Sequence, residues 1–95
     1  MASTDLAFTP ATELASLIGA RKLSPVELTQ ALLDRIGRLN PRVNAFCTVT
    51  ADLALAAARE AEQALVKGES RGPLHGIPFS IKDLHYTKDV RTMSG

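Results

Sequence analysis

The sequence is poor in the residue types that define several specialised protein classes. It contains no tryptophan, one tyrosine, three phenylalanines and a single cysteine, Cys47. One cysteine excludes a disulfide framework and is typical of a reducing compartment. Lysine and arginine number 11 against 10 aspartates and glutamates, so the chain lacks the basic excess that favours binding to nucleic-acid phosphates. We therefore expect no direct contact with nucleic acid.

Long apolar stretches are also lacking. The longest purely apolar run, Leu53–Ala58, is far shorter than the ~18–20 residues that span a bilayer. The first residues, Met1–Asp5, have neither the basic nor the apolar region of a secretion signal. These features predict a cytoplasmic protein without a membrane segment. Apolar residues make up 45% of the chain at a net charge of +1, which excludes intrinsic disorder and indicates at most one small domain.

The first two thirds of the sequence predict three helices, over about residues 10–21, 24–39 and 51–67. Thr9 and Pro10 are typical of a helix start, because proline at the first helical position loses no hydrogen bond. Apolar residues then recur at helical spacing, at Leu14, Leu17 and Ile18.

The second predicted helix has a capping box, in which Ser24 can accept from the N3 amide and Glu27 can reach back. We expect it to end near Asn40, because the residue before Pro41 is disfavoured in helical conformation. Its apolar face is Leu28, Leu32, Leu33, Ile36 and Leu39.

The third predicted helix is rich in alanine, and small side chains allow close packing against a neighbouring helix or sheet. Its expected apolar stripe is Leu53, Ala57, Ala61 and Leu65.

A glycine- and proline-rich loop follows, and residues 78–83 then predict a short strand. Alternation along the strand places Ile77, Phe79 and Ile81 on one face. Ser80 and Lys82 lie on the opposite face. One strand cannot satisfy its own backbone donors and acceptors. We therefore predict an α/β fold, with N-terminal helices plus an early core strand, that is incomplete in this chain.

Lys82 is the main candidate for chemistry. An ammonium group near the end of a strand, beside Phe79 and Ile81, can lose water, which disfavours its charged form and lets the amine accept a proton. The ordinary alternative is that Lys82 points to solvent or pairs with Asp83. Ser80 lies two residues away and could form a Ser–Lys dyad, but no oxyanion-hole signature surrounds it.

The remaining candidates are weak. His75, His85 and Cys47 match no zinc spacing, so no metal site is predicted. Cys47 stands among apolar neighbours and is interpreted as a buried, inert thiol. The glycines at 68, 72 and 76 lack the Lys-Ser/Thr ending of a phosphate-binding loop and are interpreted as turn residues.

The order of these motifs resembles the amidase signature family over about residues 10–95. Residues 72–83, GPLHGIPFSIKD, fill every defined position of the family's first hallmark, G-P-L-x-G-[IV]-P-[FVI]-x-[IV]-K-D. Residues 23–28 resemble its LSxxEL helix start, and residues 35–46 resemble its RIxxLNPxxNAF segment. The alanine-rich stretch 57–64 and the final RTMSG also resemble family segments, although Gln63-Ala64 replaces the frequent Ala-Asp.

The resemblance implies a hydrolase of carboxylic amide bonds with a Ser–cis-Ser–Lys triad. Lys82 would be its general base and Asp83 would support that lysine, with no metal and no organic cofactor. Both family serines lie several tens of residues after the lysine, beyond this chain, and neither Ser80 nor Ser94 takes their place. Residues 1–95 would then be the N-terminal part of an amidase catalytic domain, and we expect the isolated chain to be inactive.

The implied partners are a small-molecule amide substrate and the remainder of the amidase domain, and a homodimer is left open. A second interpretation within the family is the A subunit of a glutamyl-tRNA(Gln) amidotransferase, which would release ammonia from glutamine. A third, outside enzymology, is a non-catalytic helical interaction module.

Overall fold

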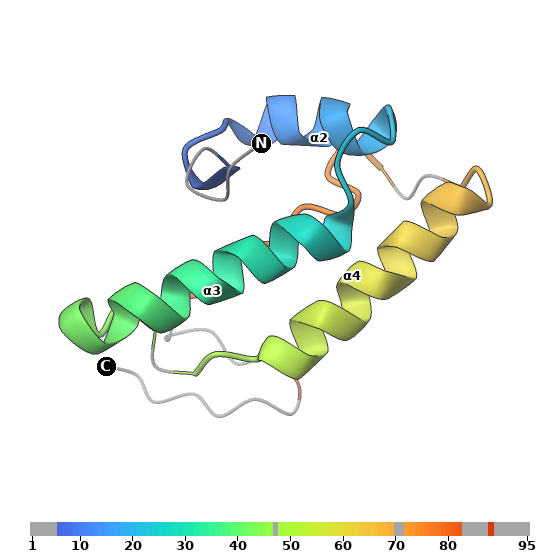
Figure 1. Cartoon of the computed structure of the whole chain (residues 1–95). Helices are drawn as coiled ribbons and strands as arrows, with labels where there is room; N and C mark the ends of the chain where they lie inside the picture. The colour runs from blue at the N-terminus through green and yellow to red at the C-terminus, as the bar shows by residue number, and fades with distance from the viewer. Residues whose placement is uncertain (1–5, 47, 70–71, 83–87, 89–95) are drawn as a thin grey trace.

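The structure is a computed structural model that describes residues 6–46, 48–69, 72–82 and 88. Its main elements are helices α2 (Ala11–Gly19), α3 (Pro25–Val43) and α4 (Ala51–Val66). Helices α3 and α4 pack side by side and run in opposite directions, and α2 crosses near the start of α3 (Figure 1). The loop that follows α4 returns to the end of the molecule where α2 crosses α3. Residues 72–77 of this loop, the motif loop, contact all three helices there.

Helix α2 is shorter than the sequence predicts, because Arg21 adopts a left-handed backbone with φ 59°. The amide of Lys22 donates to the carbonyl of Leu17 at 2.8 Å, which reverses the chain after the helix. Leu14 and Ile18 are buried, as predicted from their spacing. The helix therefore contributes its predicted apolar face to the core.

Helix α3 begins as predicted and ends later. The Ser24 hydroxyl accepts from the amides of Val26 and Glu27, at 3.1 and 3.4 Å. The prediction that the helix ends near Asn40 is wrong, since it continues through Pro41 to Val43. Proline removes a hydrogen bond from the helix interior, but both its turn and Gly37 are exposed to solvent, where water can solvate the freed carbonyl.

The end of α3 is closed by Asn44 and Asn40. Asn44 is left-handed, with φ 50°, and its amide donates to the carbonyl of Asn40. The Asn40 side chain also makes two hydrogen bonds to the backbone of Phe46. Its Nδ2 donates to the Phe46 carbonyl at 3.0 Å, and its Oδ1 accepts from the Phe46 amide at 2.9 Å. The LNP segment of the sequence thus lies in the last turns of α3, and its Asn40 fixes the start of the connection to α4.

Helix α4 buries a face made of alanines, of which the sequence predicted Ala61. Its buried residues are Ala58, Ala61 and Ala64, whereas Leu53 is 60% exposed. The predicted stripe is therefore wrong at Leu53 and Ala57, although Leu65 packs against the core. Alanine side chains leave room for a neighbouring helix, and α4 turns Ala58, Ala61 and Ala64 toward the rest of the molecule.

The core lies between α2, the start of α3 and the motif loop. Its buried members are Leu6, Leu14, Ile18, Leu23, Leu28 and Ala31, with Leu17, Leu32, Leu65 and Ile77 packed against them. Ile77 belongs to the motif loop, so this loop contributes a side chain to the core.

No strand forms over the described residues 77–82, so the strand predicted at 78–83 is not shown in this part of the chain; Asp83 lies outside the described residues. A strand needs a neighbour to pair its backbone groups, and the described segments provide helices and loops only. The predicted α/β class is accordingly not shown, because the regular secondary structure of the described residues is helical. No helix in the described ranges is long and apolar enough to cross a membrane.

Candidate functional site

The hallmark motif begins with two consecutive tight turns. The amide of His75 donates to the carbonyl of Gly72 at 3.2 Å, and the amide of Ile77 donates to that of Leu74 at 3.0 Å. Gly72 and Gly76 have φ of 129° and 81°, a region that disfavours other residues. The prediction that these glycines serve turns is confirmed, and the turns bring the chain back onto the helices.

Gly76 and Ile77 attach the motif loop to α2 and α3. A Cβ atom at Gly76 would lie 2.9 Å from Cγ of Pro25 and 3.4 Å from Cγ2 of Ile18. Ile77 packs against the core cluster. These contacts fix the point at which the chain leaves the helical layer toward Lys82.

His75 attaches the same loop to α4. Its Nε2 lies 2.8 Å from the carbonyl oxygen of Ala61. A carbonyl oxygen can only accept, so this hydrogen bond requires a proton on Nε2. The ring is half-buried, which shields the bond from water. The sequence held no signal for this contact, because every residue has a carbonyl and His75 occupies the undefined position of the motif.

The metal interpretation gains nothing from the described residues. Cys47 and His85 lie outside them, and no group of three or more potential ligands occurs within them. His75 is engaged with α4 instead.

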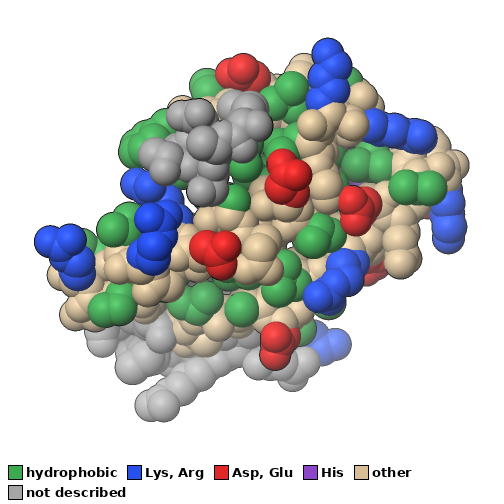
Figure 2. Space-filling model, viewed as in Figure 1, with side chains coloured by type: hydrophobic (Ala, Val, Ile, Leu, Met, Phe, Trp, Pro, Cys, Tyr) green, Lys and Arg blue, Asp and Glu red, His purple; other side chains and the backbone are tan. Residues whose placement is uncertain are grey.

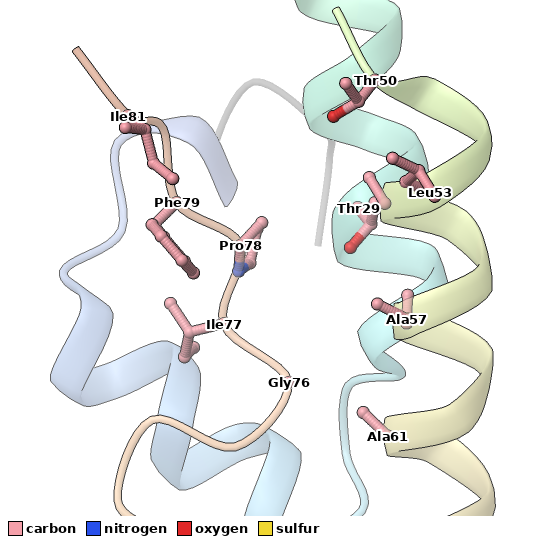
Figure 3. A pocket seen from close by; sticks show the side chains of 12 residues that line it. Thr29, Thr50, Leu53, Ala57, Ala61, Gly76, Ile77, Pro78, Phe79 and Ile81 are labelled. Atoms are coloured by element: carbon pink, nitrogen blue, oxygen red, sulfur yellow. The ribbon is translucent and has the colours of Figure 1, made fainter. Parts of the chain in front are cut away.

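An open groove of about 380 Å³ lies between α4 and the segment that leads to Lys82. In Figure 3 Ala57 and Ala61 lie on the α4 side and Thr29 comes from α3. The opposite side is formed by Ile77, Pro78, Phe79 and Ile81. Apart from Thr29 and Thr50 the side chains that line it are apolar: Leu53, Ala54, Ala57, Ala58, Ala61, Ile77, Pro78, Phe79 and Ile81. The groove can bind apolar groups but holds no cluster of charges.

Lys82 is exposed at the end of this segment, and so is Ser80. Phe79 and Ile81, which the sequence placed around the lysine, are 84% and 50% exposed. The described residues therefore do not desolvate Lys82. The structure brings together the motif glycines, His75 and the helices, whereas Lys82 has no catalytic partner among the described residues and Asp83 lies outside them.

Exposed apolar residues also occur away from the groove. They include Phe8, Val43, Val66 and Leu74, each more than 60% exposed. On the face seen in Figure 2, apolar side chains stand among acidic and basic ones along α3 and α4. The Phe8 ring is partly covered by Arg35, whose guanidinium carbon lies 5.0 Å from the ring centroid.

Comparison with known proteins identifies relatives over most of the chain. The A subunit of the glutamyl-tRNA(Gln) amidotransferase of Methylococcus capsulatus is 54% identical over 83 residues, which are 87% of this chain and 17% of that protein. The corresponding subunit of Acidothermus cellulolyticus is 46% identical over 92 residues, 97% of this chain and 18% of that protein. A Mycobacterium tuberculosis protein named "Putative amidase AmiD" is 44% identical over 84 residues, 88% of this chain and 18% of that protein.

The chain thus spans less than one fifth of the length of these relatives. No solved structure matches it. The family model described as Amidase matches residues 27–95, which include most of α3, all of α4 and the whole hallmark motif. The chain belongs to the amidase family.

Proposed function

We propose that this chain is the N-terminal part of an enzyme that hydrolyses carboxylic amide bonds, with Lys82 as its general base. The observation that carries the proposal is the attachment of the hallmark loop. His75, Gly76 and Ile77 hold it to the helices, so the chain emerges toward Lys82 from a fixed point. The names of the relatives support amide chemistry.

In the proposed mechanism the neutral amine of Lys82 takes a proton from a bridging serine, which takes one from the nucleophilic serine. The nucleophile then attacks the amide carbonyl, and backbone N–H groups stabilise the oxyanion. The proton returns to the leaving amine as the C–N bond breaks, and water hydrolyses the acyl-enzyme. Both serines come from sequence beyond Gly95, and Asp83 supports the lysine.

The substrate class is a small-molecule amide, and glutamine is the more specific candidate. The amidotransferase subunit of Methylococcus is 54% identical over its matched stretch, against 44% for the mycobacterial protein. In the glutamine case, partner subunits would receive the ammonia. Ammonia release from glutamine, measured with and without copurified partner subunits, separates the amidotransferase from a free amidase.

The proposed immediate partner of residues 76–81 is the remainder of the catalytic domain. If the remainder of the domain buried Phe79, Ile81 and Leu53, it would cover the exposed apolar side of the groove. It would also give Lys82 the apolar surroundings that its proposed role needs. We propose a cytoplasmic location on the cysteine content alone, which cell fractionation would test.

The first test is the reading frame itself. Its continuation past Gly95 should encode two serines in a glycine-rich segment within about the next hundred residues. If that sequence has no such serines, the helical interaction module becomes the better interpretation.

The second test is kinetic. In the full-length protein, Lys82→Ala should lower kcat by about 10²–10⁴-fold, the usual contribution of a general base. Lys67→Ala is the matched control, because Lys67 is an exposed lysine at the end of α4, and it should keep wild-type kcat. Full activity of the Lys82→Ala protein would refute the proposed function, as would robust turnover by residues 1–95 alone.

A further inference from the structure

We propose that His75 is a positioning residue for the amidase reaction, which holds the hallmark loop on α4 and thereby sets where Lys82 lies. This inference rests on the proposed function and adds to it a residue at the motif's undefined position. The role is carried by the hydrogen bond from Nε2 to the carbonyl oxygen of Ala61 at 2.8 Å.

The three attachments of the loop act in different directions. Gly76 lies against Pro25 of α3 and Ile18 of α2, and Ile77 packs into the core beside them. His75 supplies the hydrogen bond to α4. Without its hydrogen bond, the loop would keep its apolar contacts but could pivot about them, away from α4.

A small pivot at the loop is enlarged at the lysine. Lys82 is separated from Ile77 by a segment that has no helix or strand and is exposed from Phe79 onward, and each residue of such a segment can span up to ~3.3–3.6 Å. A misplacement of about 1 Å at a reacting group can reduce the rate by roughly 10²-fold. A bond distant from the reacting atoms can therefore control kcat.

The bond is chemically suited to a constant anchor. Nε2 donates in the imidazolium and in the neutral tautomer that carries its proton there. Glutamine carries an amide N–H donor on a side chain of similar reach, whereas leucine fills comparable space without a donor. These two substitutions separate the hydrogen bond from the volume of the ring.

The experiment compares His75→Leu and His75→Gln in the full-length protein, with Gln63→Ala as the control on an exposed position of α4. We expect His75→Leu to lower kcat about tenfold with KM changed less than twofold. His75→Gln should recover kcat to within about threefold of wild type, and Gln63→Ala should match wild type. Thermal midpoints identify any loss that comes from unfolding.

Amide hydrogen exchange of the peptide covering residues 72–82 gives a readout that does not depend on activity. Exchange should quicken in His75→Leu and return toward wild type in His75→Gln. Wild-type kcat in His75→Leu, failure of His75→Gln to restore it, or unchanged exchange would each overturn the proposal. If Lys82→Ala is fully active while exchange behaves as expected, the proposed function fails and His75 keeps only its anchoring of the loop.

Discussion

Gly76 and Pro25 are packed so closely that no side chain fits between them. A Cβ atom at Gly76 would come within 2.9 Å of Cγ and 3.3 Å of Cβ of Pro25. Pro25 is buried at the first position of α3, and Gly76 has a φ of 81°. The helix start and the hallmark motif, which the sequence presents as separate signals, therefore form one packing unit.

Gly76→Ala should lower the free energy of unfolding by about 2–4 kcal/mol, which combines left-handed strain of about 1 kcal/mol with overpacking. Gly68→Ala is the matched control, because Gly68 has a similar φ of 78° but nothing within 4 Å of the added carbon. It should cost about 1 kcal/mol. Urea unfolding of both variants measures the difference, and equal losses would show that Pro25 simply moves aside.

Leu28→Ala and Leu53→Ala test which leucines support the fold. Leu28 is fully buried, whereas Leu53 is 60% exposed. In residues 1–95, truncation of Leu28 should lower the free energy of unfolding by about 2–5 kcal/mol, and truncation of Leu53 by less than about 0.5 kcal/mol. Urea unfolding is the measurement. A comparable loss at both positions would mean that α4 turns its predicted leucine stripe inward.

The sequence predicted α2 and α3 well because their apolar residues are large and regularly spaced, as at Leu14, Ile18 and Leu28. It misplaced the buried face of α4, where hydrophobicity favours Leu53 over Ala58. In the structure α4 packs against α3 with Ala58 buried and Leu53 exposed, so the buried face follows the small side chains and not the most hydrophobic ones. The extension of α3 through Pro41 depends on local solvent exposure, which no propensity records.

The candidate site was predictable only as a motif. Spacing and turn chemistry pointed to Gly76 and Lys82, whereas the contacts of His75 with Ala61 and of Gly76 with Pro25 join residues far apart in the chain. Such contacts depend on how helices pack, which local patterns do not specify. The predicted strand at 78–83 needed a partner strand, and the described residues supply none.

Ser24 connects two helices, which makes its replacement costly. Its hydroxyl caps α3 and donates to Oε1 of Glu62 in α4 at 2.6 Å. Ser24→Ala should lower the free energy of unfolding by about 1–2 kcal/mol. Ser24→Thr keeps a hydroxyl group and should retain most of the wild-type free energy of unfolding. A double-mutant cycle with Glu62→Gln, read by urea unfolding, should give a coupling of about 0.5–1 kcal/mol. Additive effects would show that the Ser24–Glu62 bond contributes nothing beyond the cap.

Arg21 combines a favourable bond with an unfavourable backbone. Its Nη2 donates to the carbonyl of Leu65 at 2.6 Å, near the end of α4, while its φ is 59°. Arg21→Ala should lower the free energy of unfolding by about 0.5–1 kcal/mol, because it loses a cation at a helix C-terminus and keeps the strain. Arg21→Gly loses the same bond but relieves strain of roughly 1 kcal/mol. We therefore expect Arg21→Gly to be close to wild type and more stable than Arg21→Ala in urea unfolding. If Arg21→Ala proves the more stable of the two, relief of backbone strain does not decide the outcome at this position, and the greater freedom of glycine in the unfolded chain outweighs it.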